Sequence, residues 1–302
     1  MKEGNAALFE LELELPDQRL TALANRLVGF AARFKRLRQD LRLLVDREGL
    51  EKWSKQHYGK RLSLLDSLLD RYPLVIFHGD VGTGKTATAE AAANALTKEL
   101  HKEAILFKLS TRVRGGGNVG EMSMLINQAF DLVVHEAGRA RLAYLIIDEA
   151  DSLATTRSMK QSHHEDKVAV NTLIQKIDDS RRFDGRIVVI LCTNRYESLD
   201  PAILRRAAFV EEFKRPDDGE RRELIDMDCA GLDLSATEIT ELICATGPRG
   251  QHKIGYTFSD LRTRVIPEAL AQAYPTRKLT SADFVTAVER IKPTPAIEGV
   301  ET

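Results

Sequence analysis

The chain has 302 residues, of which 43% are hydrophobic and 29% are charged, and its formal net charge is −1. This composition is typical of a soluble globular protein with room for two hydrophobic cores, and it argues against a general attraction to nucleic acid or membranes. The 3 cysteines lack metal-ligand spacing and fit a reducing compartment. No apolar run approaches the ~20 residues that span a bilayer, so we expect a cytoplasmic protein that does not enter a membrane.

Residues 1–50 are predicted to hold one strand and one long amphipathic helix. Apolar and acidic side chains alternate over residues 8–15, the pattern of a half-buried strand, and Pro16 ends it. Apolar residues then recur every three or four positions, at Leu20, Leu23, Leu27, Phe30, Phe34, Leu37, Leu41 and Leu44. This spacing predicts a single helix close to a coiled-coil seam. Its apolar stripe packs either on its own chain or on a partner, and the pattern leaves both alternatives open.

Residues 51–214 are predicted to form an α/β domain, because strand and helix patterns alternate there. The strand candidates are 73–78, 104–110, 143–148, 186–193 and 208–213. The helix candidates between them are 85–101, 121–137, 166–179 and 200–206. Alternation of this kind means a parallel sheet, here with five strands, covered by helices on both faces.

Residues 215–292 are predicted to form a small helical lid domain, since no strand pattern follows Lys214. Four helix candidates remain, at 218–228, 235–245, 258–273 and 281–290, and Thr280 or Ser281 is the expected cap of the last. The proline-rich tail, residues 293–302, is expected to be disordered.

A glycine-rich motif joins the first strand of the α/β domain to its first helix. Gly79, Asp80, Val81, Gly82, Thr83, Gly84, Lys85 and Thr86 fit the pattern G-x-x-x-x-G-K-[ST], and Ala87 follows them. The backbone N–H groups of such a loop wrap a phosphate chain, and the helix N-terminus adds positive potential. Lys85 is predicted to reach the β- and γ-phosphates and Thr86 to ligate Mg²⁺. The stretch from Gly79 to Ala87 is therefore a predicted nucleoside-triphosphate site.

Charged and polar side chains follow the next buried strands at the edge where parallel sheets place ligands. Asp148 is predicted to hold Mg²⁺, and Glu149 to act as the general base on the attacking water. Asn194, after residues 188–193, can hydrogen-bond that water or the γ-phosphate. Arg205 and Arg206 end a short helix, and in an oligomer such arginines can reach the nucleotide of an adjacent subunit.

In this order and spacing the motifs resemble those of AAA+ ATPases over about residues 55–292. The resemblance implies ATP and Mg²⁺ as cofactors, a ring that is usually a hexamer, and ATP bound at the subunit interface. It implies that Asn194 is the sensor 1 residue. Arg262, with Arg264 as the alternative, falls at the sensor 2 position.

Within AAA+ proteins the chain is most similar to the pachytene-checkpoint (thyroid-receptor-interactor) ATPases, which remodel HORMA-domain proteins. Residues 171–178 and 265–274 resemble two of their helices, and Arg206 falls on their arginine finger. The resemblance implies a HORMA-domain substrate that is converted from the closed to the open state in bacterial antiphage signalling (CBASS).

Three departures from the family pattern stand out. Gly79-Asp80-Val81 replaces the usual Gly-Pro-Pro, and the second finger arginine is replaced by Phe209. The expected first pore loop, 112–120, lacks an aromatic residue, and residues 156–166 are the expected second pore loop.

Two other functions remain open. Arg112, Arg114 and the basic flank of the first helix could serve a nucleic-acid-acting ATPase such as a clamp or helicase loader. The near-neutral charge and the lack of a recognisable DNA-binding module argue against this class. A nucleotide-gated scaffold without turnover is disfavoured by Asp148, Glu149 and Asn194.

Overall fold

The computed structural model describes residues 8–110, 120–151, 164–248 and 253–296. Apart from their last residues, the predicted pore loops 112–120 and 156–166 lie outside these ranges. The chain divides into two compact units. The first draws on Met1–Ala24, Ala31–His78 and Thr86–Glu211, and the second on Asn25–Phe30, Gly79–Lys85 and Glu212–Thr302.

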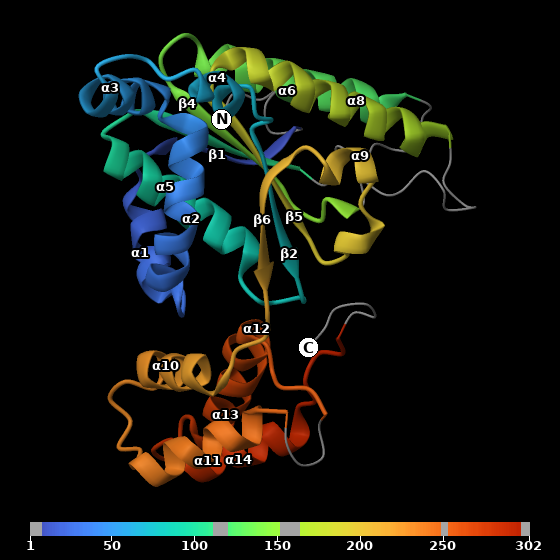
Figure 1. The fold of residues 1–302 in the computed structure, drawn as a ribbon. Coiled ribbons are helices and arrows are strands. Elements are labelled where there is room, and N and C mark those ends of the chain that lie inside the picture. The colour runs from blue at the N-terminus through green and yellow to red at the C-terminus, as the bar shows by residue number, and fades with distance from the viewer. Residues whose placement is uncertain (1–7, 111–119, 152–163, 249–252, 297–302) are drawn as a thin grey trace. The chain divides into compact units, whose positions relative to one another are not determined.

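A six-stranded sheet forms the centre of the first unit, with the strand order β1-β3-β4-β5-β2-β6 (Figure 1). Its strands are β1 (Phe9–Leu15), β2 (Leu74–Gly79), β3 (Ala104–Leu109), β4 (Leu142–Ile147), β5 (Ile187–Thr193) and β6 (Ala207–Phe213). The pairs β3–β4, β4–β5 and β5–β2 are parallel, whereas β1 pairs with β3 in the antiparallel sense. All five predicted strands are present. The predicted sheet is one strand too small because the N-terminal strand joins its edge.

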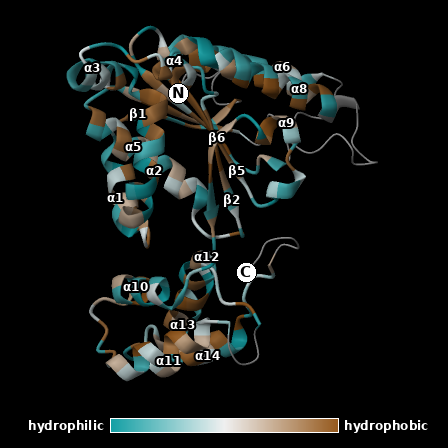
Figure 2. Ribbon diagram, in the orientation of Figure 1, coloured by the Kyte–Doolittle hydropathy of each residue, from teal (hydrophilic) through white to brown (hydrophobic). Residues whose placement is uncertain are grey.

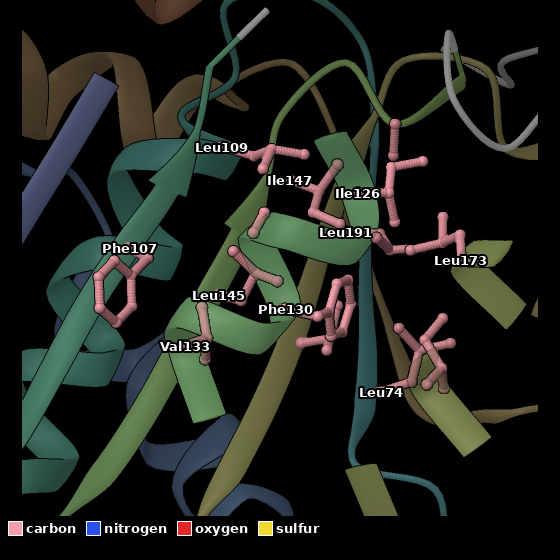
Figure 3. Packing of buried hydrophobic residues seen from close by; sticks show 14 of the residues in the cluster. Leu74, Phe107, Leu109, Ile126, Phe130, Val133, Leu145, Ile147, Leu173 and Leu191 are labelled. Carbon is pink, nitrogen blue, oxygen red and sulfur yellow. The ribbon is translucent and has the colours of Figure 1, made fainter. Parts of the chain in front are cut away.

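The core of the first unit packs one face of this sheet against two helices, α6 (Glu121–Ala137) and α8 (His164–Ser180). Every residue of β4 is buried, as expected for a central strand covered on both faces. Figure 3 shows Phe130 of α6 beside Leu145 of β4 in this core. In Figure 2 the central strands are hydrophobic, whereas α6 and α8 show hydrophobic and hydrophilic residues in alternation.

Helices that precede β3, among them residues 18–26, 30–45 and 85–100, lie on the other side of the sheet from α6 and α8 (Figure 1). The helices up to the third strand are α1 (Gln18–Arg26), α2 (Phe30–Val45), α3 (Arg47–Tyr58), α4 (Leu64–Leu69) and α5 (Lys85–Leu100). Leu37 and Leu41 of the predicted apolar stripe are 2% and 1% exposed, and no other residue of that stripe is exposed. The stripe therefore packs on its own chain.

The prediction of one long N-terminal helix is wrong, because the helix breaks between α1 and α2. Gly29 has a left-handed φ of 66° there, which glycine adopts without steric penalty. Its N–H donates to Glu223 Oε1 at 3.1 Å, and Val28 joins the hydrophobic core of the second unit. An apolar periodicity cannot reveal such a break, since the stripe continues through it.

The second unit contains the predicted helical lid, residues 215–292. Its helical elements are α10 (Asp218–Asp228), α11 (Ala236–Thr246), α12 (Phe258–Asp260), the π-helix η5 (Leu261–Val265), α13 (Ile266–Ala273) and α14 (Ser281–Arg290). They surround a core that includes the fully buried Tyr256, whose hydroxyl donates to the Val288 carbonyl at 2.9 Å. Within the described ranges, no helix of either unit has the length and apolarity needed to cross a membrane.

The chain remains well packed just after α14, where the sequence predicts a disordered tail. Thr294 donates from its N–H and its hydroxyl to the carboxylate of Asp260, at 3.0 and 2.7 Å. The expectation of disorder from residue 293 therefore does not hold for this residue. Proline content predicts a lack of helix and strand, and it does not exclude bonds between a loop and a distant acid.

Candidate active site

The glycine-rich loop belongs to the second unit, where strand β2 ends at Gly79. Gly79 has a φ of 135°, and a Cβ atom there would lie 2.0 Å from the carbonyl oxygen of Phe213. Gly82 has a φ of 70°, and its Cβ would lie 2.7 Å from the Cβ of Ser259. Only glycine fits either place, so the tight turn of the loop depends on both residues.

The loop is held by its own side chains. The ammonium group of Lys85, 7% exposed, donates to the carbonyls of Gly79 and Asp80 at 3.1 and 2.7 Å. Thr83 donates from its hydroxyl to the Asp80 carbonyl at 2.8 Å. These contacts place the positive end of Lys85 at the centre of the predicted phosphate cradle.

Two predicted magnesium ligands meet in the first unit. The hydroxyl of Thr86, in the first turn of α5 with Ala87, donates to Asp148 Oδ2 at 2.7 Å. No cluster of three or more acidic, histidine or cysteine ligands occurs in the described ranges. Mg²⁺ is usually held by one or two protein oxygens together with water and substrate phosphates, so this pair fits it. When bound, the ion would neutralise charge on the phosphates.

Glu149, the predicted general base, has a strained backbone. Its φ of 47° lies in the left-handed region, which residues other than glycine, asparagine and aspartate seldom adopt. The N–H of Glu149 donates to Asp148 Oδ1 at 2.9 Å, and the next N–H, of Ala150, donates to the Cys192 carbonyl at 2.9 Å. These two bonds hold the turn. Strain of this kind gathers at functional sites.

Asn194 follows β5 directly, at the same edge of the sheet as the acidic pair of β4. Its side chain makes no hydrogen bond with the described part of the chain. The adjacent Thr193 hydroxyl donates to Asp151 Oδ1 at 2.9 Å and accepts the N–H of Arg195 at 3.0 Å. The turn is therefore fixed on both sides of Asn194, and its amide remains available for a ligand.

The two predicted finger arginines differ sharply in their surroundings. Arg206 is 8% exposed and donates from Nε and Nη2 to the Asp178 carboxylate at 2.5 and 2.8 Å. Its guanidinium also lies over the ring of Tyr72, and Asp178 raises the pKa of Arg206. Arg205 is exposed, and its side chain has no hydrogen bond or ion pair with the residues that the structure describes. Only Arg205 is therefore available to another molecule without breaking an existing contact.

Both candidate sensor 2 arginines lie in the π-helix η5, a rare helix type that often marks functional sites. Arg262 donates to both carboxylate oxygens of Asp228, at 2.5 and 3.1 Å. Arg264 donates to Asp260 Oδ1 at 2.9 Å and is the more exposed of the two side chains, at 45% against 24%. The choice between them stays a prediction.

A lysine that belongs to none of the sequence motifs lies near Asp148, one of the two predicted magnesium ligands. Lys108 of β3 is 2.6 Å from Glu10 of β1 and 3.9 Å from both Glu90 of α5 and Asp148. Burial raises the pKa of the Glu90 carboxyl, against the opposing effect of Lys108. The signal in the sequence is a single lysine in an otherwise apolar strand, but its acidic partners come from distant segments. Lys108 balances the negative charge around Asp148.

These loops, strand ends and arginines define an AAA ATPase domain. Residues 75–216 match the model of the ATPase family associated with various cellular activities (AAA), and membership of that family supports ATPase activity. The chain belongs to the family of CD-NTase-associated protein 6. It is 49% identical over 298 residues to the Escherichia coli (strain KTE188) protein of that name, covering 98% of this chain and 100% of the relative.

Solved structures agree with this assignment. A chain in the structure of the E. coli MS115-1 HORMA:CdnC:Trip13 complex is 38% identical, with a TM-score of 0.90 and coverage of 98% of this chain and 100% of the other. The structure of Rhizobiales Trip13 is 33% identical, with a TM-score of 0.73 and coverage of 95% and 100%. The fold, including the helical second unit, is therefore that of Trip13-like proteins.

Proposed function

We propose that the chain hydrolyses ATP as a hexameric ring in the cytoplasm and remodels a HORMA-domain protein from the closed to the open state. In this way it would regulate bacterial antiphage signalling. One observation carries the proposal: the chain aligns along nearly its whole length, with a TM-score of 0.90, to a chain of a complex that contains a HORMA protein.

The proposed chemistry rests on the pair of acids after β4. Asp148 and Thr86, whose Oδ2 and Oγ1 atoms are 2.7 Å apart, would hold Mg²⁺, which would neutralise phosphate charge. Glu149 would accept a proton from the attacking water. Asn194 would orient that water or the γ-phosphate, and Lys85 would neutralise charge on the β- and γ-phosphates.

The remaining groups would link hydrolysis to the ring. Arg205 or Arg206 would reach the nucleotide of the adjacent subunit, a contact that requires a heterologous, closed ring. Arg262 or Arg264 would contact the nucleotide from η5. Each unit has its own hydrophobic core, so each can move as a body when the nucleotide changes.

The decisive experiment uses Glu149→Gln, which removes the base and keeps the shape of the side chain. We expect hydrolysis to fall about 100-fold or more, while ATP binding persists. With ATP present, this variant should form a stable complex with a purified HORMA-domain protein from the same organism. Complex formation is measured by size-exclusion chromatography.

Lys85→Ala is the matched control, because it should lose ATP binding and therefore the complex. If Glu149→Gln does not bind HORMA-domain proteins but binds DNA with a strong salt dependence, the result would instead support a nucleic-acid-acting ATPase. Near-normal hydrolysis by Glu149→Gln would reject the role of Glu149 as the base.

A further inference from the structure

The phosphate loop contains a buried acid, Asp80, where a negative charge opposes the binding of a polyanion. Its side chain is 2% exposed. Oδ1 accepts the N–H of Val81 at 2.8 Å, so the carboxylate uses one of the loop's own donors. An unbalanced carboxylate here would repel a triphosphate strongly, because charges away from bulk water are poorly screened.

Arg215 balances this charge. Its guanidinium is 8% exposed, and Nε donates to Asp80 Oδ2 at 2.6 Å. Its Nη1 and Nη2 each donate to a neutral group, the carbonyls of Gly255 at 2.6 Å and Thr294 at 2.7 Å. Within the described ranges, Asp80 is the one acid that forms an ion pair with Arg215. The two charges are therefore matched to each other.

The same contacts tie the loop to the lid from two directions. Thr294, held by Arg215, donates to the 2%-exposed carboxylate of Asp260. Asp260 and Thr257 form the capping box that starts α12. The N–H of Ser259 in that helix donates to the Gly82 carbonyl at 3.1 Å. This series of hydrogen bonds therefore begins at Asp80 and ends at Gly82, two residues of the same loop. All of its residues belong to the second unit.

We propose that Arg215 is a positioning residue for nucleotide binding: it neutralises Asp80 and fixes the loop against α12 and the segment after α14. The proposal rests on the proposed ATP site. Asp80 stands where the usual loop has a proline, and its ion pair with Arg215 makes this acid compatible with phosphate. The pair acts as a unit, so its members must be tested together.

The test measures equilibrium binding of fluorescent analogues of ATP, ADP and AMP to Arg215→Met, Asp80→Asn and the double variant. Arg215→Met should weaken ATP binding about tenfold or more, since it leaves a buried, unpaired carboxylate. The loss should shrink from ATP to ADP to AMP, because it follows phosphate charge. Adding Asp80→Asn in the same chain should restore most of the affinity, and Asp80→Asn alone should bind ATP at least as well as the wild type.

Arg222→Met, which removes an exposed arginine from α10, is the matched control and should bind like the wild type. Equal losses for all three nucleotides, or additive losses in the double variant, would overturn the proposal in favour of general loosening. Should Arg215→Met fail to fold by circular dichroism, weaker ATP binding by Asp80→Asn alone would overturn it. If the wild type binds no nucleotide, the proposed function fails, whereas unchanged binding by Arg215→Met defeats only this inference.

Discussion

Glu149 carries the most strained backbone among the predicted catalytic residues. It has a left-handed φ and lies just after Asp148, beyond the carboxyl end of β4, where open parallel sheets place their ligands. A left-handed φ costs glutamate stability that glycine would not lose. As the proposed general base, Glu149 would be kept in this conformation for function at the expense of stability.

Replacing Glu149 by glycine should therefore stabilise the fold and abolish turnover. Relief of the left-handed strain, less the entropy that glycine loses on folding, should raise the free energy of unfolding by up to about 1 kcal/mol. Chemical denaturation and a phosphate-release assay measure the two effects. Glu149→Gln, which keeps the strain, should lose turnover without gaining stability. A glycine variant less stable than the glutamine variant would contradict the assignment of strain.

Alanine substitutions at Arg205 and at Arg206 should have different effects on stability. Arg206→Ala should lower the free energy of unfolding by about 1–3 kcal/mol, because it leaves Asp178 without its partner and empties a packed site beside Tyr72. Arg205→Ala should leave stability unchanged and still reduce hydrolysis. Thermal unfolding measures the stability of both variants, and an ATPase assay measures their hydrolysis. A stable Arg206→Ala protein would show that its ion pair contributes little.

The motifs predicted that Thr86 and Asp148 act together, and these two side chains are hydrogen-bonded. They did not predict the partners that other site residues have in the free chain. Asp178 lies 28 positions from Arg206, and Asp80 lies 135 positions from Arg215. No local periodicity links such pairs. The sequence therefore shows two arginines at the end of a helix, but not that Arg206 forms an ion pair with Asp178. The motif at Asp80 likewise predicted a nucleotide contact through the backbone of the loop, and it gave no sign that the carboxylate is bound to Arg215.

Among the secondary-structure elements, capping boxes fix where the lid helices begin. Asp217, Ser235 and Thr257 each accept the N–H three residues ahead, where an acid accepts the cap's own N–H in return. At α14 the Asp283 carboxylate accepts the N–H of Thr280 at 2.9 Å, which confirms Thr280 as the cap. These signals are local in sequence, and for this reason the predicted starts of the lid helices agree with the structure.

The capping acids should make the lid sensitive to low pH. Hydrogen bonds from the Ser281 hydroxyl and from the N–H and hydroxyl of Ser235 lower the pKa of Glu238 from 4.5 to about 2. Because the folded pKa is depressed, this stabilisation is complete above pH 4.5 and is lost as pH falls towards 2. Glu238→Gln should therefore be less stable than the wild type at pH 6, and the difference should shrink by pH 3.

Thermal unfolding at several pH values measures that difference. Glu289→Gln, a change at an exposed acid of α14, is the control and should track the wild type throughout. A gap between Glu238→Gln and the wild type that stays constant with pH would show that the carboxylate charge does not stabilise the lid.

Two features of the elements had no sequence signal strong enough to predict them. The π-helix η5 interrupts the predicted helix 258–273, since one extra residue per turn is a tertiary adjustment that leaves the apolar pattern nearly intact. The break at Gly29 is set by bonds to α10, which a periodic stripe cannot reveal.

In the proposed ring, ATP hydrolysis by one subunit depends on an arginine of the adjacent subunit. Lys85→Ala subunits should lack nucleotide but keep Arg205 and Arg206, and Arg205→Ala subunits should bind nucleotide but lack the free arginine. If the arginine acts across an interface, a mixture of the two impaired variants should be more active than the two measured separately, since mixed rings contain some complete sites. ATPase activity measured against mixing ratio tests this, and full turnover by dilute monomers would contradict it.

The antiparallel strand β1 has a consequence for handling the protein. It covers the open side of β3, whose Ile105, Leu106 and Phe107 are almost wholly buried. Glutamates alternate with apolar residues along β1, and charged side chains on an edge strand discourage pairing with a further strand from another molecule. A chain shortened to begin at Pro16 would expose a bare hydrophobic edge to its neighbours in solution. Such a chain would precipitate before any defect in ATP hydrolysis could be measured.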